Sequence, residues 1–271
     1  MSEQKQRGFE ELVAVMARLR GEGGCPWDRE QTHASLKPYL VEEVYEALEA
    51  IDQGDDAELR RELGDVLLQV VFHAQIASEE GRFSIEEVCR AIVDKLIRRH
   101  PHVFGETQVE NADQVLSNWE RIKQAERQEE DKPDSALEGV PRQLPALLRA
   151  QRIQHKAARV GFDWKQLDGP LDKVEEEWGE LRQACQRGTP QELEEEFGDL
   201  LFALVNTSRF LKIDAEEALR RAVDKFERRF RAVEAAFRAQ GRQLPDCTLE
   251  EMDQVWDQVK KEEVNRPEEE R

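Results

Sequence analysis

Glu42-Glu43-Val44-Tyr45-Glu46 opens a pattern that the chain carries twice. In the first copy it is followed by Glu62-Leu63-Gly64-Asp65 and then by Asp94-Lys95-Leu96-Ile97-Arg98-Arg99. The second copy reads Glu176-Glu177-Trp178-Gly179-Glu180, Glu196-Phe197-Gly198-Asp199 and Asp224-Lys225-Phe226-Glu227-Arg228-Arg229. The acids at positions 43, 46, 62 and 65 all recur 134 positions later. This internal repeat predicts two related helical units in tandem.

The spacing of the acids indicates a metal site in each copy. Residues three apart lie on one face of a helix, so each block presents a pair of carboxylates. If the two acidic helices pack antiparallel, four carboxylates meet in an oxygen-only group, which suits a hard cation such as Mg²⁺. The candidate ligands are Glu43, Glu46, Glu62 and Asp65 in the first copy, and Glu177, Glu180, Glu196 and Asp199 in the second.

One choice of ligand stays open at this point. Glu176 could replace Glu177 as a ligand, since positions 176 and 180 also lie one helical turn apart. The cations that would oppose this negative charge come from a third helix, as Lys-x-x-Arg-Arg, in both copies. In the second copy they are Lys225, Arg228 and Arg229.

Composition excludes several classes of protein. A formal net charge of −19 opposes binding to polymeric nucleic acid, although a bound cation and a local Lys/Arg cluster still permit a small phosphorylated ligand. The four cysteines show no C-x-x-C spacing, and neither a signal core nor a membrane-length apolar run is present. We therefore expect a cytoplasmic protein with no membrane partner.

Helical periodicity and capping residues predict an all-α fold of two tandem helical bundles. We expect an N-terminal unit at 1–128, a charged, Pro-containing linker at 129–145 and a C-terminal unit at 146–271. Ser84 and Thr189 begin capping boxes, whereas the polar stretch 25–33 reads as a loop.

Three further features have competing interpretations. A Glu-rich helix is usually only a solvated face, but agreement between the two copies indicates a shared constraint. Gly64 and Gly198 each cost about 1 kcal/mol inside a helix, which close packing of a neighbouring helix would offset. Trp119 and Trp256, each followed by Lys four positions later, are core residues or base-stacking residues.

A further set of motifs identifies a family. The acidic and basic blocks, with Cys25-Pro26-Trp27-Asp28-x-x-Gln31-Thr32, Arg98-Arg99-His100-Pro101-His102-Val103-Phe104 and Val160-Gly161-Phe162-Asp163-Trp164, resemble MazG nucleoside triphosphate pyrophosphohydrolases over nearly the whole chain. The acidic pattern alone is shared with dimeric dUTPases and phosphoribosyl-ATP pyrophosphohydrolases.

The resemblance implies an all-α, Mg²⁺-dependent, intertwined homodimer that converts a nucleoside triphosphate to the monophosphate and pyrophosphate. In tandem members of the family the C-terminal unit is regarded as the active one. The resemblance then makes Glu177, Glu180, Glu196 and Asp199 metal ligands, Lys225 and Arg229 phosphate contacts, and Trp256 and Lys123 nucleotide contacts. Arg228 is added from its place beside Arg229. Water would attack the α or the β phosphorus, and the resemblance does not choose between them.

Two alternatives remain, a narrow dUTPase or phosphoribosyl-ATP hydrolase and a non-catalytic adaptor with acidic docking faces. One difference between the copies favours the second as the active one. Arg60 and Arg61 precede Glu62, where Glu194 and Glu195 precede Glu196. Pairing of these arginines with the first site's carboxylates would weaken its affinity for Mg²⁺.

Overall fold

The protein is described here from a computed structural model. The structure describes residues 8–109, 111, 114–115, 118–119, 121–122, 126 and 135–265, with the side chains of 264 and 265 excepted. Every regular element in these residues is a helix, which confirms the all-α fold class. The chain divides into two compact units, Met1–Glu129 and Glu130–Arg271. The proposed linker at 129–145 stays a prediction.

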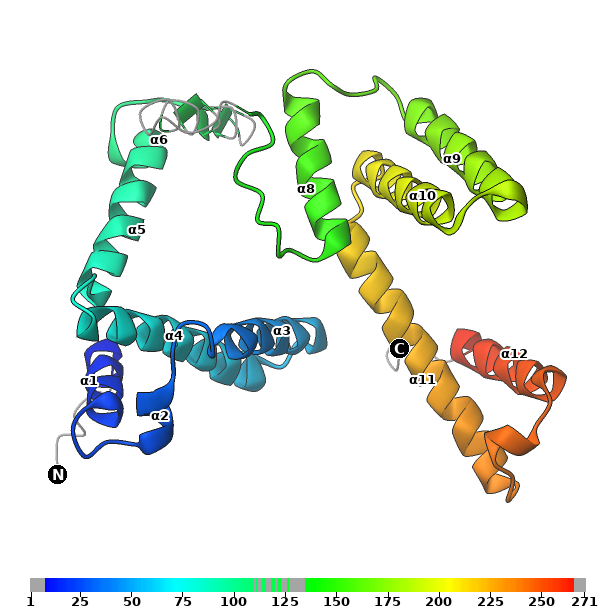
Figure 1. The fold of residues 1–271 in the computed structure, drawn as a ribbon, viewed down its shortest axis with the longest axis horizontal. Helices are drawn as coiled ribbons and strands as arrows, with labels where there is room; N and C mark the ends of the chain where they lie inside the picture. Colours follow the sequence, from blue (N-terminus) through cyan, green and yellow to red (C-terminus); the bar gives the residue numbers. More distant parts are fainter. Residues whose placement is uncertain are drawn as a thin grey trace. The chain divides into compact units, whose positions relative to one another are not determined.

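The first unit is built from six described helices (Figure 1). They are α1 (Phe9–Arg20), α2 (Pro26–Glu30), α3 (Lys37–Gln53), α4 (Asp56–Glu79), α5 (Ile85–Arg99) and α6 (Pro101–Phe104). The short helix α2 corrects the expectation of a loop at 25–33. Its sequence signal is Pro26 at the first helical position, where the missing N–H costs nothing.

The second unit repeats the helical plan. It contains α8 (Ala146–Arg159), α9 (Asp168–Arg187), α10 (Pro190–Phe210), α11 (Ala215–Ala239), a 3₁₀ turn (Leu244–Asp246) and α12 (Leu249–Asn265). In Figure 1, α9 and α10 lie side by side, and α12 folds back along the second half of α11.

Local sequence signals set the two acidic hairpins, α3–α4 and α9–α10. Gly54 ends α3 with a left-handed φ of 68°, and Asp55 then accepts hydrogen bonds from the first N–H groups of α4. In the second unit Thr189 and Glu192 form the expected capping box at the start of α10. Such a short turn makes each pair of helices antiparallel, so the acidic blocks face one another.

The first unit has a continuous apolar core in which Met16, Leu36, Val71 and Phe72 are almost fully buried. In the second unit Leu181 and Val205 are buried in the α9–α10 hairpin, whereas Val233 and Phe237 are buried on α11. None of the described helices combines the length and apolar character that a membrane span requires.

Both units leave an apolar stripe exposed on their second acidic helix. Leu63, Leu67 and Val70 on α4 are 54%, 39% and 38% exposed. The equivalent residues of α10, Phe197, Leu201 and Leu204, are 54%, 40% and 46% exposed. The i, i+4, i+7 spacing places each set on one helical face, which a single chain leaves in water.

Among the described residues, the close packing expected around Gly64 and Gly198 is not found. A Cβ added at either position would meet no atom within 4 Å. The described helices of the same unit therefore do not offset the cost of these glycines.

Candidate metal and phosphate site

The α9–α10 hairpin brings three acids of the second copy together. The carboxylates of Glu177, Glu196 and Asp199 each offer an oxygen atom within 4.8 Å of the others. Glu177 is only 5% exposed, whereas Asp199 is exposed. Glu43, Glu62 and Asp65 form the equivalent group on α3 and α4. An all-oxygen donor set of this kind fits a hard divalent cation.

Glu180 and Glu46, the fourth acids of the two copies, lie outside these groups of three. They remain electrostatically close, because Glu180 repels Glu196 and Glu46 is repelled by Glu62. Glu176 is exposed and points its carboxylate to Lys173, with Nζ 2.9 Å from Oε1. Geometry therefore favours Glu177 over Glu176 as the acid of the cluster.

The clusters hold unfavourable charge when no cation is present. Desolvation, followed by repulsion from Glu180, Glu177 and Asp199, raises the pKa of Glu196. In the first unit desolvation, followed by repulsion from Asp65, raises the pKa of Glu43. A bound cation would relieve this repulsion, so metal binding and protonation compete for the same carboxylates.

Lys173 is a residue that the sequence reasoning missed. Its Nζ lies 2.7 Å from Oε1 of Glu177, and this bond is the largest cause of its raised pKa. The signal was available, because Lys173 precedes Glu177 by one helical turn. The first unit has Tyr39 at this position, and the amide of Gln69 approaches Glu43 there at 3.4 Å.

The predicted phosphate-binding residues lie on α11 and contact α12. Nε of Arg228 donates to Oε1 of Glu263 at 3.1 Å, and Nε of Arg229 donates to Oε2 at 2.7 Å. The Arg229 guanidinium also lies over the ring of Trp256, 5.9 Å from its centroid. Lys225 is exposed on the same helix.

In the described part of the chain, these cations make no direct contact with the acidic cluster. Among the described residues, no hydrogen bond or ion pair joins Lys225, Arg228 or Arg229 to a carboxylate of α9 or α10. The expectation that the third helix supplies opposite charge to its own unit's cluster is thus not met by these contacts. Lys123 lies outside the described residues.

Glu263 was also missed, although the repeat contains a signal for it. It follows Trp256 by seven positions, as Glu126 follows Trp119 in the first copy. Glu126 binds the equivalent arginines, with Nε of Arg98 at 2.6 Å and Nη2 of Arg99 at 2.6 Å. These bonds, led by the one from Arg99, lower the pKa of Glu126 to about 2.

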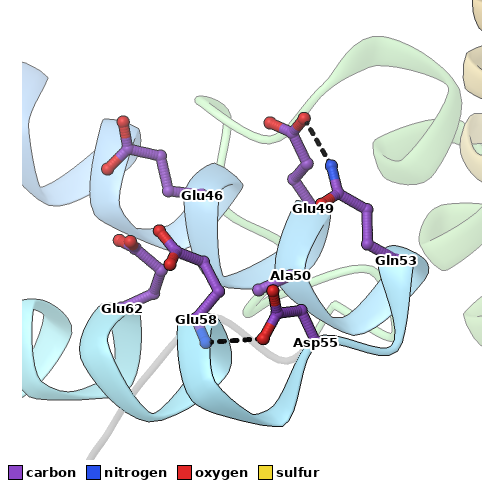
Figure 2. A pocket seen from close by; sticks show the side chains of 7 residues that line it. All are labelled: Glu46, Glu49, Ala50, Gln53, Asp55, Glu58 and Glu62. Atoms are coloured by element: carbon purple, nitrogen blue, oxygen red, sulfur yellow. Dashed lines mark hydrogen bonds between the residues drawn. The ribbon is translucent and has the colours of Figure 1, made fainter.

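A pocket of about 420 Å³ lies beside the first acidic cluster (Figure 2). It is open to solvent and strongly acidic; its lining residues are Glu46, Glu49, Ala50, Gln53, Asp55, Glu58 and Glu62. Figure 2 shows the amide of Gln53 bonded to Glu49, so it does not neutralise the pocket. Its charge favours a cation and disfavours a phosphate that lacks one.

The arginines that precede Glu62 do not act as expected. Arg61 forms an ion pair with Glu58 on the same helix, and among the described contacts it has none with a carboxylate of the acidic cluster. Positions 61 and 62 point about 100° apart around a helix, whereas 58 and 61 share a face. Weakening of the first metal site by Arg61 is therefore not supported.

Comparison with known proteins gives two matches within the chain. The family model described as the MazG nucleotide pyrophosphohydrolase domain matches residues 31–104 and 170–233. These segments contain the first and second acidic clusters respectively.

Whole-length similarity points the same way. The chain is 51% identical to the nucleoside triphosphate pyrophosphohydrolase of Escherichia coli strain K12 over 260 residues, which are 95% of this chain and 98% of that protein. It is 52% identical over 252 residues to the nucleoside triphosphate pyrophosphohydrolase/pyrophosphatase MazG of Thermotoga maritima, covering 93% of this chain and 95% of that protein.

Proposed function

The chain belongs to the MazG family of nucleotide pyrophosphohydrolases, and from this premise we propose which of its residues carry the reaction. The enzyme hydrolyses nucleoside triphosphates to nucleoside monophosphate and pyrophosphate. The observation that carries the assignment to a site is the group formed by Glu177, Glu196 and Asp199 on α9 and α10. We assign turnover mainly to this second unit.

The cation of this site is proposed to be Mg²⁺. Glu177, Glu196 and Asp199 would hold it, with Glu180 as a fourth acid at the edge, because all donors are oxygen atoms. When bound, the ion supplies positive charge to the phosphates and lowers the pKa of a water molecule. Glu43, Glu46, Glu62 and Asp65 form the second, less active metal site of the proposal.

The remaining residues bind and orient the substrate. Lys225, Arg228 and Arg229 hold the phosphates and stabilise the charge on the departing pyrophosphate. Trp256 contacts the base through its ring, and Lys123 is a further nucleotide contact that the family resemblance implies. A carboxylate of the cluster accepts the proton of the water that attacks the α or the β phosphorus.

The test of this assignment is the identity of the product. Incubation with a nucleoside triphosphate and Mg²⁺ is expected to release pyrophosphate and the nucleoside monophosphate in equal amounts. Release of orthophosphate alone would overturn the assignment.

A panel of nucleotides, including dUTP and phosphoribosyl-ATP, tests the substrate specificity. It separates an enzyme that accepts many nucleoside triphosphates from the hydrolases of narrow specificity that share the acidic pattern.

We further propose that the enzyme is a homodimer. The apolar stripe of α10 is exposed, and α11 carries a second one, Leu219, Val223, Phe226 and Phe230, at helical spacing. A second copy of the chain would cover such faces, and the open space over Gly198 leaves room for it.

In this proposal the dimer also completes the site. The cations of α11 have no described bond to the carboxylates of their own chain, but they lie on the helix whose apolar stripe a partner would cover. Pairing would bring Lys225 and Arg229 of one copy to the acidic cluster of the other.

Complementation between two inactive variants tests this arrangement. Asp199→Asn and Arg229→Ala are co-expressed with different tags, and the mixed dimer is purified. If the site is shared between copies, one of its two sites is intact, and about half of the wild-type activity is expected. No recovery in the mixed dimer would place both groups of residues in one chain.

The proposal puts the enzyme in the cytoplasm. All four cysteines are free, as expected in a reducing compartment. The adaptor alternative stays testable: it predicts that Glu180→Gln and Asp199→Asn disturb binding of a basic partner and leave every hydrolytic activity unchanged.

A further inference from the structure

Glu263 on α12 is placed between two arginines that are neighbours in sequence. One of its carboxylate oxygens accepts from Nε of Arg228 and the other from Nε of Arg229. The side chains of Glu263 and Arg229 are each 21% exposed, whereas that of Arg228 is 64% exposed. The pair formed with Arg229 is thus the better shielded from water.

Because Glu263 binds Arg228 and Arg229 through Nε, the Nη groups of both arginines stay available for a ligand. A guanidinium has five N–H donors, of which only one is on Nε. Among the described residues, the Nη groups of Arg228 and Arg229 have no hydrogen-bond partner. They are the atoms that form two parallel bonds to a phosphate. Trp256 limits the guanidinium of Arg229 further, because the ring lies against it.

The first unit has the same contact in a different form. Glu126 accepts from Arg99 through both Nε, at 3.4 Å, and Nη2, at 2.6 Å. One terminal nitrogen of Arg99 is thus consumed by the glutamate, whereas both terminal nitrogens of Arg229 remain. The carboxylate recurs in both copies, but only the second copy keeps the whole Nη fork of this arginine available.

We propose that Glu263 is a positioning residue for the hydrolysis of nucleoside triphosphates. It fixes Arg228 and Arg229 through Nε, offsets the repulsion between the two cations, and so aims their Nη groups at the phosphates. It makes no contact with the substrate itself. This inference rests on the proposed function of the second unit.

Substitutions at Glu263 test the proposal through KM and kcat measured separately. Glu263→Ala removes both acceptor oxygens, so Arg228 and Arg229 are no longer held in position to bind the phosphates. We expect KM to rise about tenfold and kcat to fall less than about threefold. Glu263→Gln keeps one acceptor oxygen and the shape of the side chain, so KM is expected to rise by a smaller factor. If the alanine variant does not fold, Glu263→Gln tests the proposal in its place.

Glu262→Ala is the matched control. It makes the same change of charge on the adjacent residue, whose carboxylate accepts from Gln258 and, among the described residues, contacts neither Arg228 nor Arg229. We expect KM and kcat of this variant to equal those of the wild type. A rise in KM for both variants would show that only net charge matters and would overturn the proposal.

Other outcomes are equally decisive. A fall in KM for Glu263→Ala would show that Glu263 competes with the phosphates for the arginines. A lower Tm with unchanged KM and kcat would show that Glu263 has a purely structural role.

Binding of pyrophosphate, measured by calorimetry, provides a readout without turnover. Glu263→Ala is expected to weaken the binding of pyrophosphate about tenfold. Wild-type protein that binds pyrophosphate but releases none from a triphosphate would contradict the proposed function and leave the Glu263 comparison intact.

Discussion

The two units hold the same three acids in the same geometry but surround them with different charges. The nearly buried Glu177 pairs with the ammonium group of Lys173 at 2.7 Å, whereas Glu43 accepts a hydrogen bond from the neutral amide of Gln69 at 3.4 Å. An ammonium group offsets a carboxylate charge, and a neutral amide does not. The second unit therefore compensates the negative charge of its cluster better than the first.

The surface beside the acidic cluster is also more negative in the first unit than in the second. The pocket of the first unit carries five carboxylates and a formal charge of −5. At the equivalent positions of the second unit, 134 residues later, Glu49, Gln53 and Asp55 are replaced by Gln183, Arg187 and Thr189. The formal charge there is −2. The same three acids thus lie in a field that opposes a polyphosphate far more strongly in the first unit.

The largest expected difference between the units concerns the metal ligands. Asp199→Asn should reduce pyrophosphate release at least about 100-fold, because a charged ligand of the proposed cation is lost. Asp65→Asn should leave most of the activity. Rates of pyrophosphate release at saturating Mg²⁺ measure both. Equal losses would show that both units turn over, and the reverse order would place the active site in the first unit.

The arginines should show a smaller difference. Arg229→Ala removes a guanidinium with both Nη groups available, and we expect kcat/KM to fall about 10- to 100-fold. Arg99→Ala should change kcat/KM less than about threefold, since Glu126 already engages Nη2 of this residue. Steady-state kinetics of the two variants decide the matter. Equal losses of kcat/KM in the two variants would mean that it does not matter which nitrogen atoms of the arginine the glutamate binds.

Exchanging the charges beside the clusters should have a modest effect. Glu49→Gln with Gln53→Arg gives the first unit two features of the second, because it removes one negative charge and adds one positive charge. In an Asp199→Asn background we expect nucleotide binding to strengthen about threefold at low ionic strength and the gain to disappear in salt. Titration of a fluorescent nucleotide at two salt concentrations measures it. A gain that survives in 1 M salt would not be electrostatic.

The smallest effect concerns stability without metal. The pKa of Glu43 is raised, so its ionised form costs stability at pH values above that pKa, and the cost disappears as falling pH protonates it. Asp65→Asn removes the largest source of repulsion on Glu43 and should raise the Tm of the metal-free protein at pH 7, with a smaller gain near pH 4.5. Asp199→Asn should give a smaller rise, because Lys173 already compensates Glu177. Thermal melts in EDTA measure both, and a lower Tm for Asp65→Asn would contradict the repulsion.

Residues near one another in sequence were the predictable ones. The helices followed from apolar periodicity and from capping residues such as Ser84 and Thr189. The acid pairs followed from the three-residue spacing, because a short turn between two helices leaves only an antiparallel arrangement. The two differences have local causes: Pro26 is a common loop residue but begins α2, and the pairing of Arg61 with the carboxylates of the first site fails because Arg61 shares its helical face with Glu58.

The sequence alone thus determined the two tandem helical units, their acidic clusters and the family, since all three depend on spacing within a few helical turns and on its repetition. Only the tertiary structure decided that Glu177 and not Glu176 joins the cluster, that Glu263 binds Arg228 and Arg229, and that the stripe on α10 stays exposed. The physical reason is the separation in sequence between the residues that make contact. Helical geometry fixes which residues share a face, but the partner of that face lies tens of residues away and is selected by packing.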